Sequence, residues 1–272
     1  MARTRVPGKR KQGAGDDVDP RYIVPGLSRG LTLLQLFSRK QSAQTLAELA
    51  GRMKLSRSAT YRLVYTLHQD GFLARDDESR RYRLTSKALS LGFDFLDSQA
   101  ITEIAQPFLR QLSDRTSAAV HIAILDGWNA VYLSRVMPAV ALVTNLQVGA
   151  RLPAHVTSSG RMLLAHQDDD RLEAIYGLLK AECRLVPPPA SALALLEQAQ
   201  QDRRRGYVFH RSIMTPGISS IACPVFEKSG VAAAITVIGP DQAMQALGGE
   251  KVLKVRVGET ASHISRRMGY AG

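Results

Sequence analysis

Two short amphipathic segments follow one another between residues 45 and 70, and both have helical spacing. The apolar positions of the first are Leu46, Leu49, Ala50 and Met53, and those of the second are Ala59, Leu63, Val64 and Leu67. This recurrence predicts a helix in each segment. Thr45 can cap the first helix with Glu48 as its capping-box partner, and Ser56 can cap the second. The short connection between them predicts a helix-turn-helix.

The polar face of the second helix carries guanidinium groups, hydroxyls and a phenol, with almost no acid. A helix that enters the major groove of DNA needs such groups at its N-terminal end, since they reach base edges and phosphates. The candidate DNA contacts are Thr45, Ser56, Arg57, Ser58, Thr60, Tyr61 and Arg62. The alternative is a pair of packed helices whose charged face is only solvated.

A β-hairpin is predicted directly after the second helix. Residues 72–75 and 81–84 are short alternating runs, and the polar residues 76–80 form a turn between them. A helix-turn-helix followed by a hairpin is a winged helix, which favours DNA binding over the packing alternative. Arg80 and Arg81 lie near the hairpin tip, where we expect them to contact phosphates or the minor groove.

Two further helices flank the predicted winged helix. Ser28 is expected to cap a helix that ends near Phe37 and packs behind the helix-turn-helix. Residues 85–97 are rich in large apolar side chains for one helix beside a small domain. We expect this second helix to be a connector and a dimer contact. The alternative is that it docks on its own winged domain.

From residue 100 onwards, the sequence pattern changes, and both helices and strands are predicted. Helices are predicted over residues 100–116, 157–166, 168–180, 191–205 and 242–268, and strands over residues 118–125, 130–137, 140–148, 207–212, 218–226 and 231–238. The first three strands are expected to form an antiparallel meander, which Leu152 and Pro153 end. Helices on one face of a mostly antiparallel sheet give an α+β domain.

Charge is distributed unevenly along the 272-residue chain, whose formal net charge is +12. Residues 1–97 contain 18 Lys and Arg against 10 Asp and Glu, which gives +8, whereas residues 98–272 contain 18 against 14, which gives +4. The larger surplus near the predicted winged helix suits a polyanionic partner. Residues 1–23 are expected to form a flexible basic arm.

Membrane, disulfide and metal-binding functions find no support in the sequence. No apolar run reaches the length of a membrane span, and no signal-peptide core follows the basic N-terminus. Cys183 and Cys223 are too few for a disulfide framework, and the six histidines show no paired ligand spacing. We therefore expect a cytoplasmic protein with no metal, no cofactor and no membrane partner.

Catalysis is also not indicated. Ser158 or Ser159 near His155 could suggest a nucleophile and a base, but no Gly-x-Ser-x-Gly elbow surrounds them and a serine at a helix start is usually a cap. No catalytic residue is assigned. A ligand-responsive DNA-binding regulator remains, beside a small-molecule binding or enzymatic domain whose basic module has another use. Salt-dependent binding to a palindromic duplex separates the two, since only the regulator requires it.

Several stretches of the chain resemble the IclR family of transcriptional regulators. They are residues 24–31 (Val-Pro-Gly-Leu-Ser-Arg-Gly-Leu), the winged helix, residues 149–161 (Gly-Ala-Arg-Leu-Pro-Ala-His-Val-Thr-Ser-Ser-Gly-Arg), and residues 205–207 (Arg-Gly-Tyr) with 216–225 (Pro-Gly-Ile-Ser-Ser-Ile-Ala-Cys-Pro-Val). The opening and the run after residue 151 most resemble the branch that controls aromatic-acid catabolism by the β-ketoadipate route.

This resemblance implies domains with separate functions along the chain. Residues 24–84 would be the DNA-binding winged helix-turn-helix, residues 85–99 a linker and dimerisation helix, and residues 100–272 a GAF-like effector-binding domain. It also implies a homodimer, sometimes paired into a tetramer. A two-fold dimer would read an inverted-repeat operator on double-stranded DNA.

The resemblance also implies an effector site. Its residues are Ser158, Ser159, His210, Arg211, Ser220, Thr236 and Ile238. Many members have acids where His210 and Arg211 stand. A cationic pair beside the free N–H groups of a helix start would favour a small organic acid, such as an aromatic carboxylate or one of its breakdown products. Only one of the two can face the pocket, since successive strand residues alternate sides. Ile218, Ile221 and Ile238 are expected to form apolar walls.

Overall fold

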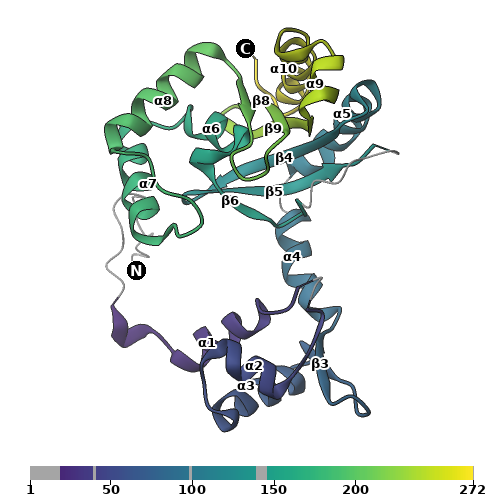
Figure 1. The fold of residues 1–272 in the computed structure, drawn as a ribbon, viewed down its shortest axis with the longest axis vertical. Coiled ribbons are helices and arrows are strands. Elements are labelled where there is room, and N and C mark those ends of the chain that lie inside the picture. Colours follow the sequence, from purple (N-terminus) through teal and green to yellow (C-terminus); the bar gives the residue numbers. More distant parts are fainter. Residues whose placement is uncertain (1–18, 39–40, 98–99, 139–145, 272) are drawn as a thin grey trace, which may run out of the picture. The chain divides into compact units, whose positions relative to one another are not determined.

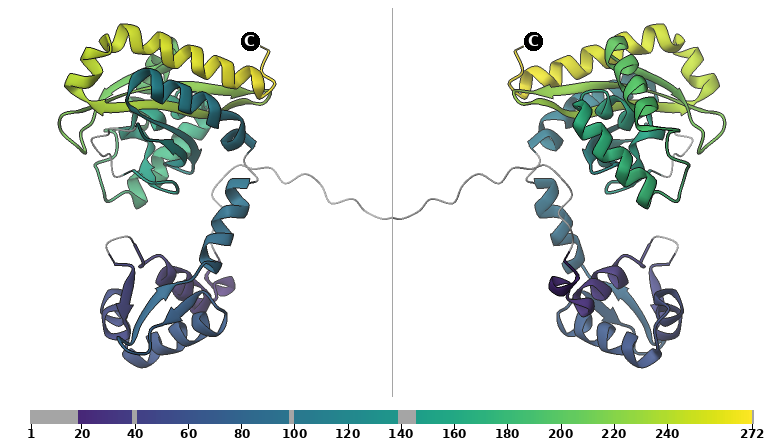
Figure 2. Two further views of the ribbon diagram at one scale, coloured as in Figure 1. Left: turned by 90° about the vertical axis from the view of Figure 1, so that its right-hand side faces the viewer. Right: turned by 90° about the vertical axis from the view of Figure 1, so that its left-hand side faces the viewer.

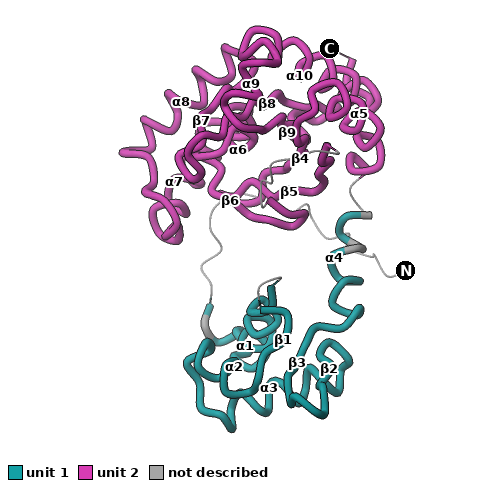
Figure 3. Tube along the Cα trace, turned by 45° about the vertical axis from the view of Figure 1, so that its right-hand side comes forward, with its two compact units in different colours: residues 1–98 teal, residues 99–272 magenta. Residues whose placement is uncertain are grey.

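The structure, a computed structural model, describes residues 19–38, 41–97, 100–138 and 146–271. The chain forms two compact units, Met1–Ser98 and Gln99–Gly272 (Figure 3). Residues 1–18 of the predicted basic arm lie outside the described residues, as do residues 139–145 of the strand predicted over 140–148.

The first unit is a winged helix (Figure 1). Its elements are the 3-10 helix η1 (Pro20–Tyr22), α1 (Pro25–Leu34), β1 (Ala43–Thr45), α2 (Leu46–Met53), α3 (Arg57–Gln69), β2 (Leu73–Arg75), β3 (Arg81–Leu84) and α4 (Lys87–Asp97). The strands form an antiparallel sheet in the order β1-β3-β2. The predicted helix-turn-helix and hairpin are confirmed, and β1 is a strand that the sequence pattern did not indicate.

Capping explains where these helices begin. Thr45 and Glu48 form the predicted capping box, in which the Thr45 Oγ1 accepts the Glu48 N–H at 3.3 Å and the Glu48 Oε2 accepts the Thr45 N–H at 2.6 Å. The Ser56 Oγ accepts a backbone N–H from the first turn of α3 at 3.2 Å. By contrast, α1 begins at Pro25 and not after Ser28, because the fixed φ of proline suits the first helical position.

One small core holds the winged helix together. Its buried members are Leu33, Leu49, Val64, Leu73 and Tyr82. They come from α1, α2, α3, β2 and β3, so these elements meet at one centre. Because α3 buries one side in this core, its other side is left on the surface.

The second unit is an α+β domain. Its elements are α5 (Ala100–Thr116), β4 (Ala119–Asp126), β5 (Asn129–Val136), β6 (Arg151–Pro153), the 3-10 helix η2 (Ala154–Val156), α6 (Ser158–Leu164), α7 (Asp169–Glu182), α8 (Ala192–Arg205), β7 (Val208–Arg211), β8 (Ile218–Glu227), β9 (Gly230–Pro240), α9 (Asp241–Ala246) and α10 (Gly249–Arg267). The described strands form one antiparallel sheet in the order β6-β5-β4-β9-β8-β7. The predicted fold class is confirmed. The pairing of β4 with β9 joins the two halves of the domain.

Helices cover both faces of this sheet, which corrects the prediction of one covered face. Helices α5 and α10 lie side by side over one face (Figure 2). Helix α6 packs on the other face, where its Met162 and Leu163 meet Ala222 of β8. The next residue, Cys223, faces Gly258 of α10. Adjacent strand residues point to opposite faces, so α6 and α10 are on opposite sides.

Two further predictions about this unit are wrong. The last helix is interrupted, because Gly248 (φ 97°) and Gly249 (φ 63°) adopt the left-handed conformation that glycine tolerates, and this separates α9 from α10. Leu152 and Pro153 do not end the sheet but belong to its edge strand β6, where they pair with Ala130 and Asn129. None of the helices that the structure describes is long and apolar enough to cross a membrane.

Candidate functional site

The exposed face of α3 is the first candidate site. Arg57, Ser58, Tyr61 and Arg62 are exposed near the start of the helix. Guanidinium groups, a hydroxyl and a phenol at this end can donate hydrogen bonds to base edges and phosphates. Tyr65 extends the face by one turn, with its ring centroid 6.0 Å from that of Tyr61. It was not predicted, although its spacing of four residues from Tyr61 was available as a signal.

Two of the predicted DNA-contacting hydroxyls are engaged within the protein. Thr60 is fully buried, and its Oγ1 donates to the Ser56 carbonyl at 3.0 Å. The prediction for Thr60 is therefore corrected, because it lies on the core side of α3. Thr45 is a helix cap whose hydroxyl also donates to Glu48 at 3.0 Å, so this hydroxyl has no proton left for DNA. Ser56 is a cap that remains exposed.

The tip of the wing presents Arg80. It is exposed and adopts a left-handed φ of 54°. The Asp76 carboxylate holds the turn by accepting the Ser79 N–H at 2.7 Å and its hydroxyl at 2.6 Å. Arg81 is instead ion-paired with Glu48 at 3.2 Å and donates to a backbone carbonyl of β1 at 3.0 Å. The prediction of Arg81 as a tip contact is corrected, since it joins the wing to α2.

A cavity of about 380 Å³ on the α6 side of the sheet is the second candidate site. Strand register gathers its residues: His210 pairs with Ser220, Ser220 with Ile238, and Thr236 with His121. Side chains at two-residue spacing share a face of a sheet, so these five line one surface. The rest of the lining is Tyr132, Leu146, Leu152, Val156, Thr157, Ser158, Ser212, Met214, Thr215 and Ile218.

This cavity, which we call the effector cavity, contains polar atoms without partners. His121 is 1% exposed, and neither of its ring nitrogens has a hydrogen-bond partner among the described residues. The same holds for His210 Nε2 and Thr236 Oγ1. Buried polar groups in proteins are normally paired. These atoms therefore indicate where the polar groups of a ligand could be bound.

Burial favours the neutral form of both imidazoles in the cavity. Burial, reinforced by the positive charge of Arg135, lowers the pKa of His121 to about 4. Burial, reinforced by the charge of Arg161, also lowers the pKa of His210. A neutral imidazole has one N–H donor and one acceptor nitrogen. The cavity thus offers hydrogen-bond donors without a fixed positive charge.

The alternation of strand residues separates His210 from Arg211. His210 lines the cavity, whereas Arg211 is exposed and is not part of the lining. The predicted role of Arg211 is corrected for this reason. Ser158 lines the cavity, but Ser159 is fully buried beside it, with its Oγ 2.8 Å from the hydroxyl of Tyr132. Ser159 therefore positions a lining residue and is not one itself.

Part of the effector cavity is not predicted by the sequence. Ile218 and Ile238 line it as predicted walls, but Ile221 is fully buried on the opposite side of the sheet. The sequence offers His121, with Arg135 on the adjacent strand, as a contact of an anionic effector, against an equal alternative of a solvent-facing or internally paired role, and it does not indicate Tyr132. In the structure the rings of His121 and Tyr132 meet edge to face with centroids 5.7 Å apart. Alternation along their strands was visible in the sequence, but nothing in it indicated which face would enclose a cavity.

Both units match models of one protein family. The model of the IclR helix-turn-helix domain matches residues 26–77, and the model of the bacterial transcriptional regulator IclR C-terminal domain matches residues 93–266. The second match alone covers more than half of the chain. This chain belongs to the IclR family.

Individual IclR relatives agree with the family models. The Pca regulon regulatory protein of Pseudomonas putida is 35% identical over 85% of this chain and 78% of its own length. An IclR family transcriptional regulator from Brucella abortus is 26% identical, with a TM-score of 0.69 over 93% of this chain and 96% of that one. An IclR homologue from Microbacterium hydrocarbonoxydans, solved with 4-hydroxybenzoate, has the same fold, with 24% identity and a TM-score of 0.75 over 90% of this chain and 100% of that one.

Membership of the IclR family gives the chain its general role. It is a transcriptional regulator with a helix-turn-helix DNA-binding domain, and not an enzyme. The His155 Nε2 lies 2.9 Å from the Pro187 carbonyl. No group of three or more His, Cys, Asp or Glu side chains that could hold a metal ion occurs within the described ranges.

Proposed function

We propose that this IclR-family regulator controls a catabolic operon in response to a small organic acid, either an aromatic carboxylate or one of its breakdown products. The observation that carries the proposal is the effector cavity, where unpaired imidazole and hydroxyl groups lie beside apolar walls. Small-molecule sites are mostly apolar, and a few polar groups fix the orientation of the ligand. A carboxylate with a ring matches both parts of this surface.

Neutral donors would recognise the carboxylate. His121, His210 and Thr236 can each donate one hydrogen bond into the cavity, and hydrogen bonds to an ionised acceptor are stronger than neutral ones. The predicted cationic recognition through Arg211 is replaced by this arrangement. A carboxylate next to His121 would favour its charged form and raise its pKa, so binding would be tighter at lower pH.

Two relatives support an aromatic acid as the effector class. The Pseudomonas putida relative is named for the Pca regulon, and the Microbacterium hydrocarbonoxydans homologue was solved with 4-hydroxybenzoate. These names belong to those proteins. They agree with the resemblance of residues 24–31 and 152–161 to the aromatic-acid branch of the family.

We infer that the regulator binds DNA as a homodimer. Helices α1 and α4 expose Leu27, Leu31, Leu89 and Leu91, each more than half accessible. Leu27, Leu31 and Leu91 also line an apolar groove of about 650 Å³ between α1 and α3. Contiguous apolar surface of this kind marks an interaction site. A two-fold pairing would give two α3 helices for an inverted-repeat operator, with half-sites about one helical turn apart or a multiple of it.

The effector class can be tested by calorimetry. We expect benzoate or 4-hydroxybenzoate to bind at least about tenfold more tightly than its neutral amide, since one charge-assisted hydrogen bond contributes roughly 1.5–3 kcal/mol. His121→Gln should weaken the acid, whereas His263→Gln, an exposed change on α10, should not. Equal affinity for acid and amide would show that the site does not read a carboxylate. The bound acid must also change the affinity for operator DNA in a salt-controlled gel-shift titration.

A further inference from the structure

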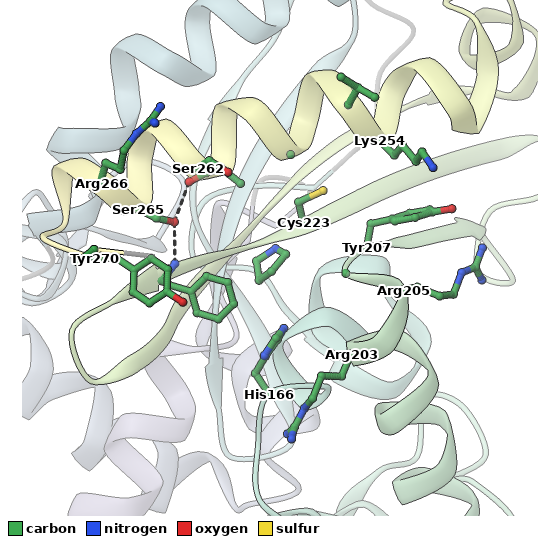
Figure 4. A pocket seen from close by; sticks show the side chains of 17 residues that line it. His166, Arg203, Arg205, Tyr207, Cys223, Lys254, Ser262, Ser265, Arg266 and Tyr270 are labelled. Carbon is green, nitrogen blue, oxygen red and sulfur yellow. Dashed lines mark hydrogen bonds between the residues drawn. The ribbon is translucent and has the colours of Figure 1, made fainter.

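A second and larger cavity, of about 770 Å³, lies between α10, the end of α8 and the outer edge of β8 (Figure 4). It shares no lining residue with the effector cavity. Strand β7 pairs with β8 only as far as Ala222, so the edge of β8 is open from Cys223 onwards. The residues of α10 that face this edge include Gly258, Ala261 and Ser262, whose small side chains leave the space unfilled.

The lining of this cavity, which we call the cationic cavity, is strongly positive in charge. Its charged residues are Arg203, Arg205, Lys254 and Arg266, and none of the Asp and Glu residues that the structure describes lines it. Arg205 is neutralised by Glu250 at 2.8 Å. Arg203 donates to two backbone carbonyls that follow α6, which orients its guanidinium without neutralising it. Within the described part of the chain, no ion pair neutralises Arg203, Lys254 or Arg266.

Aromatic rings form the other part of the wall. The Phe226 ring stacks on Tyr270 with centroids 5.0 Å apart, and the His166 ring meets Phe226 edge-on at 5.0 Å. His166 Nε2 is buried without a hydrogen-bond partner among the described residues. Figure 4 shows Tyr207 lying with Arg205 and Lys254 at the far side of the cavity from Tyr270. Aromatic and cationic groups therefore occur at both ends.

We propose that this cavity is a second ligand site, for a polyanion that carries a flat aromatic ring, as a nucleotide does. The ring would pack against Phe226 and Tyr270 and accept or donate a hydrogen bond at His166 Nε2. With the ring at the Tyr270 end, the anionic groups would extend towards Lys254 at the other end, and Arg266 would add positive charge beside the ring (Figure 4). A simple monocarboxylate would leave most of these cations unpaired. The Cys223 thiol in the wall takes no covalent part, because burial raises its pKa to about 12.

The test is calorimetry of the full-length protein, free of DNA, with adenosine diphosphate as the probe. Pyrophosphate supplies the charge without the ring, and adenosine supplies the ring without the charge. We expect adenosine diphosphate to bind more tightly than either. Lys254→Gln with Arg266→Gln should weaken it about tenfold or more, as expected when charge-assisted contacts are lost. The matched control is Lys251→Gln with Arg267→Gln, exposed on the same helix outside the cavity, and it should change the affinity less than about twofold.

Three results would overturn the proposal. The first is no measurable binding of adenosine diphosphate. The second is an equal loss in the two double variants, which would mean that the net positive charge of the chain attracts the probe without a defined site. The third is pyrophosphate binding as tightly as adenosine diphosphate, which would mean that the ring is not read. His121→Gln should leave this binding intact, so the result is independent of the proposed organic-acid effector.

Discussion

Replacing His121 with glutamine is expected to make the second unit less sensitive to acid. The imidazole is 1% exposed, and burial lowers its pKa from 6.5 to about 4. As the pH falls, the unfolded chain binds this proton before the folded chain does. The contribution of His121 to stability is therefore fully present above about pH 6.5 and is lost as the pH falls from 6.5 towards 4.

The size of the effect follows from the two pKa values. The difference between 6.5 and about 4 corresponds to about 3 kcal/mol in full, of which about 2 kcal/mol falls between pH 7 and pH 5. Domains are stable by only about 5–15 kcal/mol, so this loss is measurable. Burial also lowers the pKa of His155, His166 and His210. The contributions of these three histidines to stability are unchanged in His121→Gln. The quantity to compare is therefore the difference between the stability-versus-pH profiles of the variant and of the unmodified protein.

The chain contains a natural probe for this measurement. Trp128 is its single tryptophan, and it lies in the second unit, packed against the core beside α7, with its indole N–H donating to Glu182 at 3.0 Å. Urea unfolding followed by tryptophan fluorescence at pH 7, 6 and 5 should give a flatter stability profile for His121→Gln than for the unmodified protein. His263→Gln, an exposed change, should reproduce the unmodified profile. If His121→Gln and the unmodified protein lost the same stability to within about 0.5 kcal/mol, a smaller difference than linkage predicts, burial would not be holding His121 neutral.

Two further predictions concern the first unit. Arg57→Ala should weaken binding to cognate DNA by about 1–3 kcal/mol and relax discrimination at one base pair, whereas Arg80→Ala should weaken binding to all duplexes alike and reduce the salt slope of binding by about one. Gel-shift titrations over a range of salt concentrations can measure both effects. Unchanged cognate affinity in Arg57→Ala would contradict the assignment of α3 as the helix that contacts the bases. Leu31→Asp with Leu89→Asp should lower operator affinity, because it would place charges in the proposed dimer surface. The fold of each protomer should remain intact, because both side chains are exposed. If the double variant bound the operator with unchanged affinity, and light scattering gave complexes of unchanged mass, this surface would not be the dimer contact.

The winged helix was largely predictable because its signals are local. A cap with an acid three residues later, an apolar face at helical spacing and a polar turn each involve neighbouring residues, and Thr45, Ser56 and residues 76–80 behave as those signals predict. The errors come from side-chain direction. Thr60 was grouped with Arg57 and Tyr61 by composition, but its place on the helix turns it into the core. The sequence predicts Arg81 as a contact at the wing tip because its partner, Glu48, is distant in the sequence.

The effector cavity was predictable only in part because it is made by register. Family resemblance indicated His210, Ser220, Thr236 and Ile238, which do line it. Which neighbour faces inward depends on how β7, β8, β9 and β4 align, and no pattern within a single strand specifies that alignment. His121 enters the cavity only because β4 pairs with β9, more than a hundred residues later in the chain.

Helix α6 connects the two cavities of the second unit. Its start, with Ser158, lines the effector cavity, and His166, just beyond its end, lines the cationic one. Between them, Arg161 forms a forked ion pair with Asp202 of α8 at 2.8 and 2.9 Å, and Asp202 is 1% exposed. Helix α8 ends at Arg205, in the wall of the cationic cavity. A buried fork of this kind resists small displacements, because separating its charges would leave Asp202 unpaired. A ligand that shifts α6 from one cavity must therefore move α8 with it, and the two sites would be coupled to the extent that each ligand prefers one position of this helix pair.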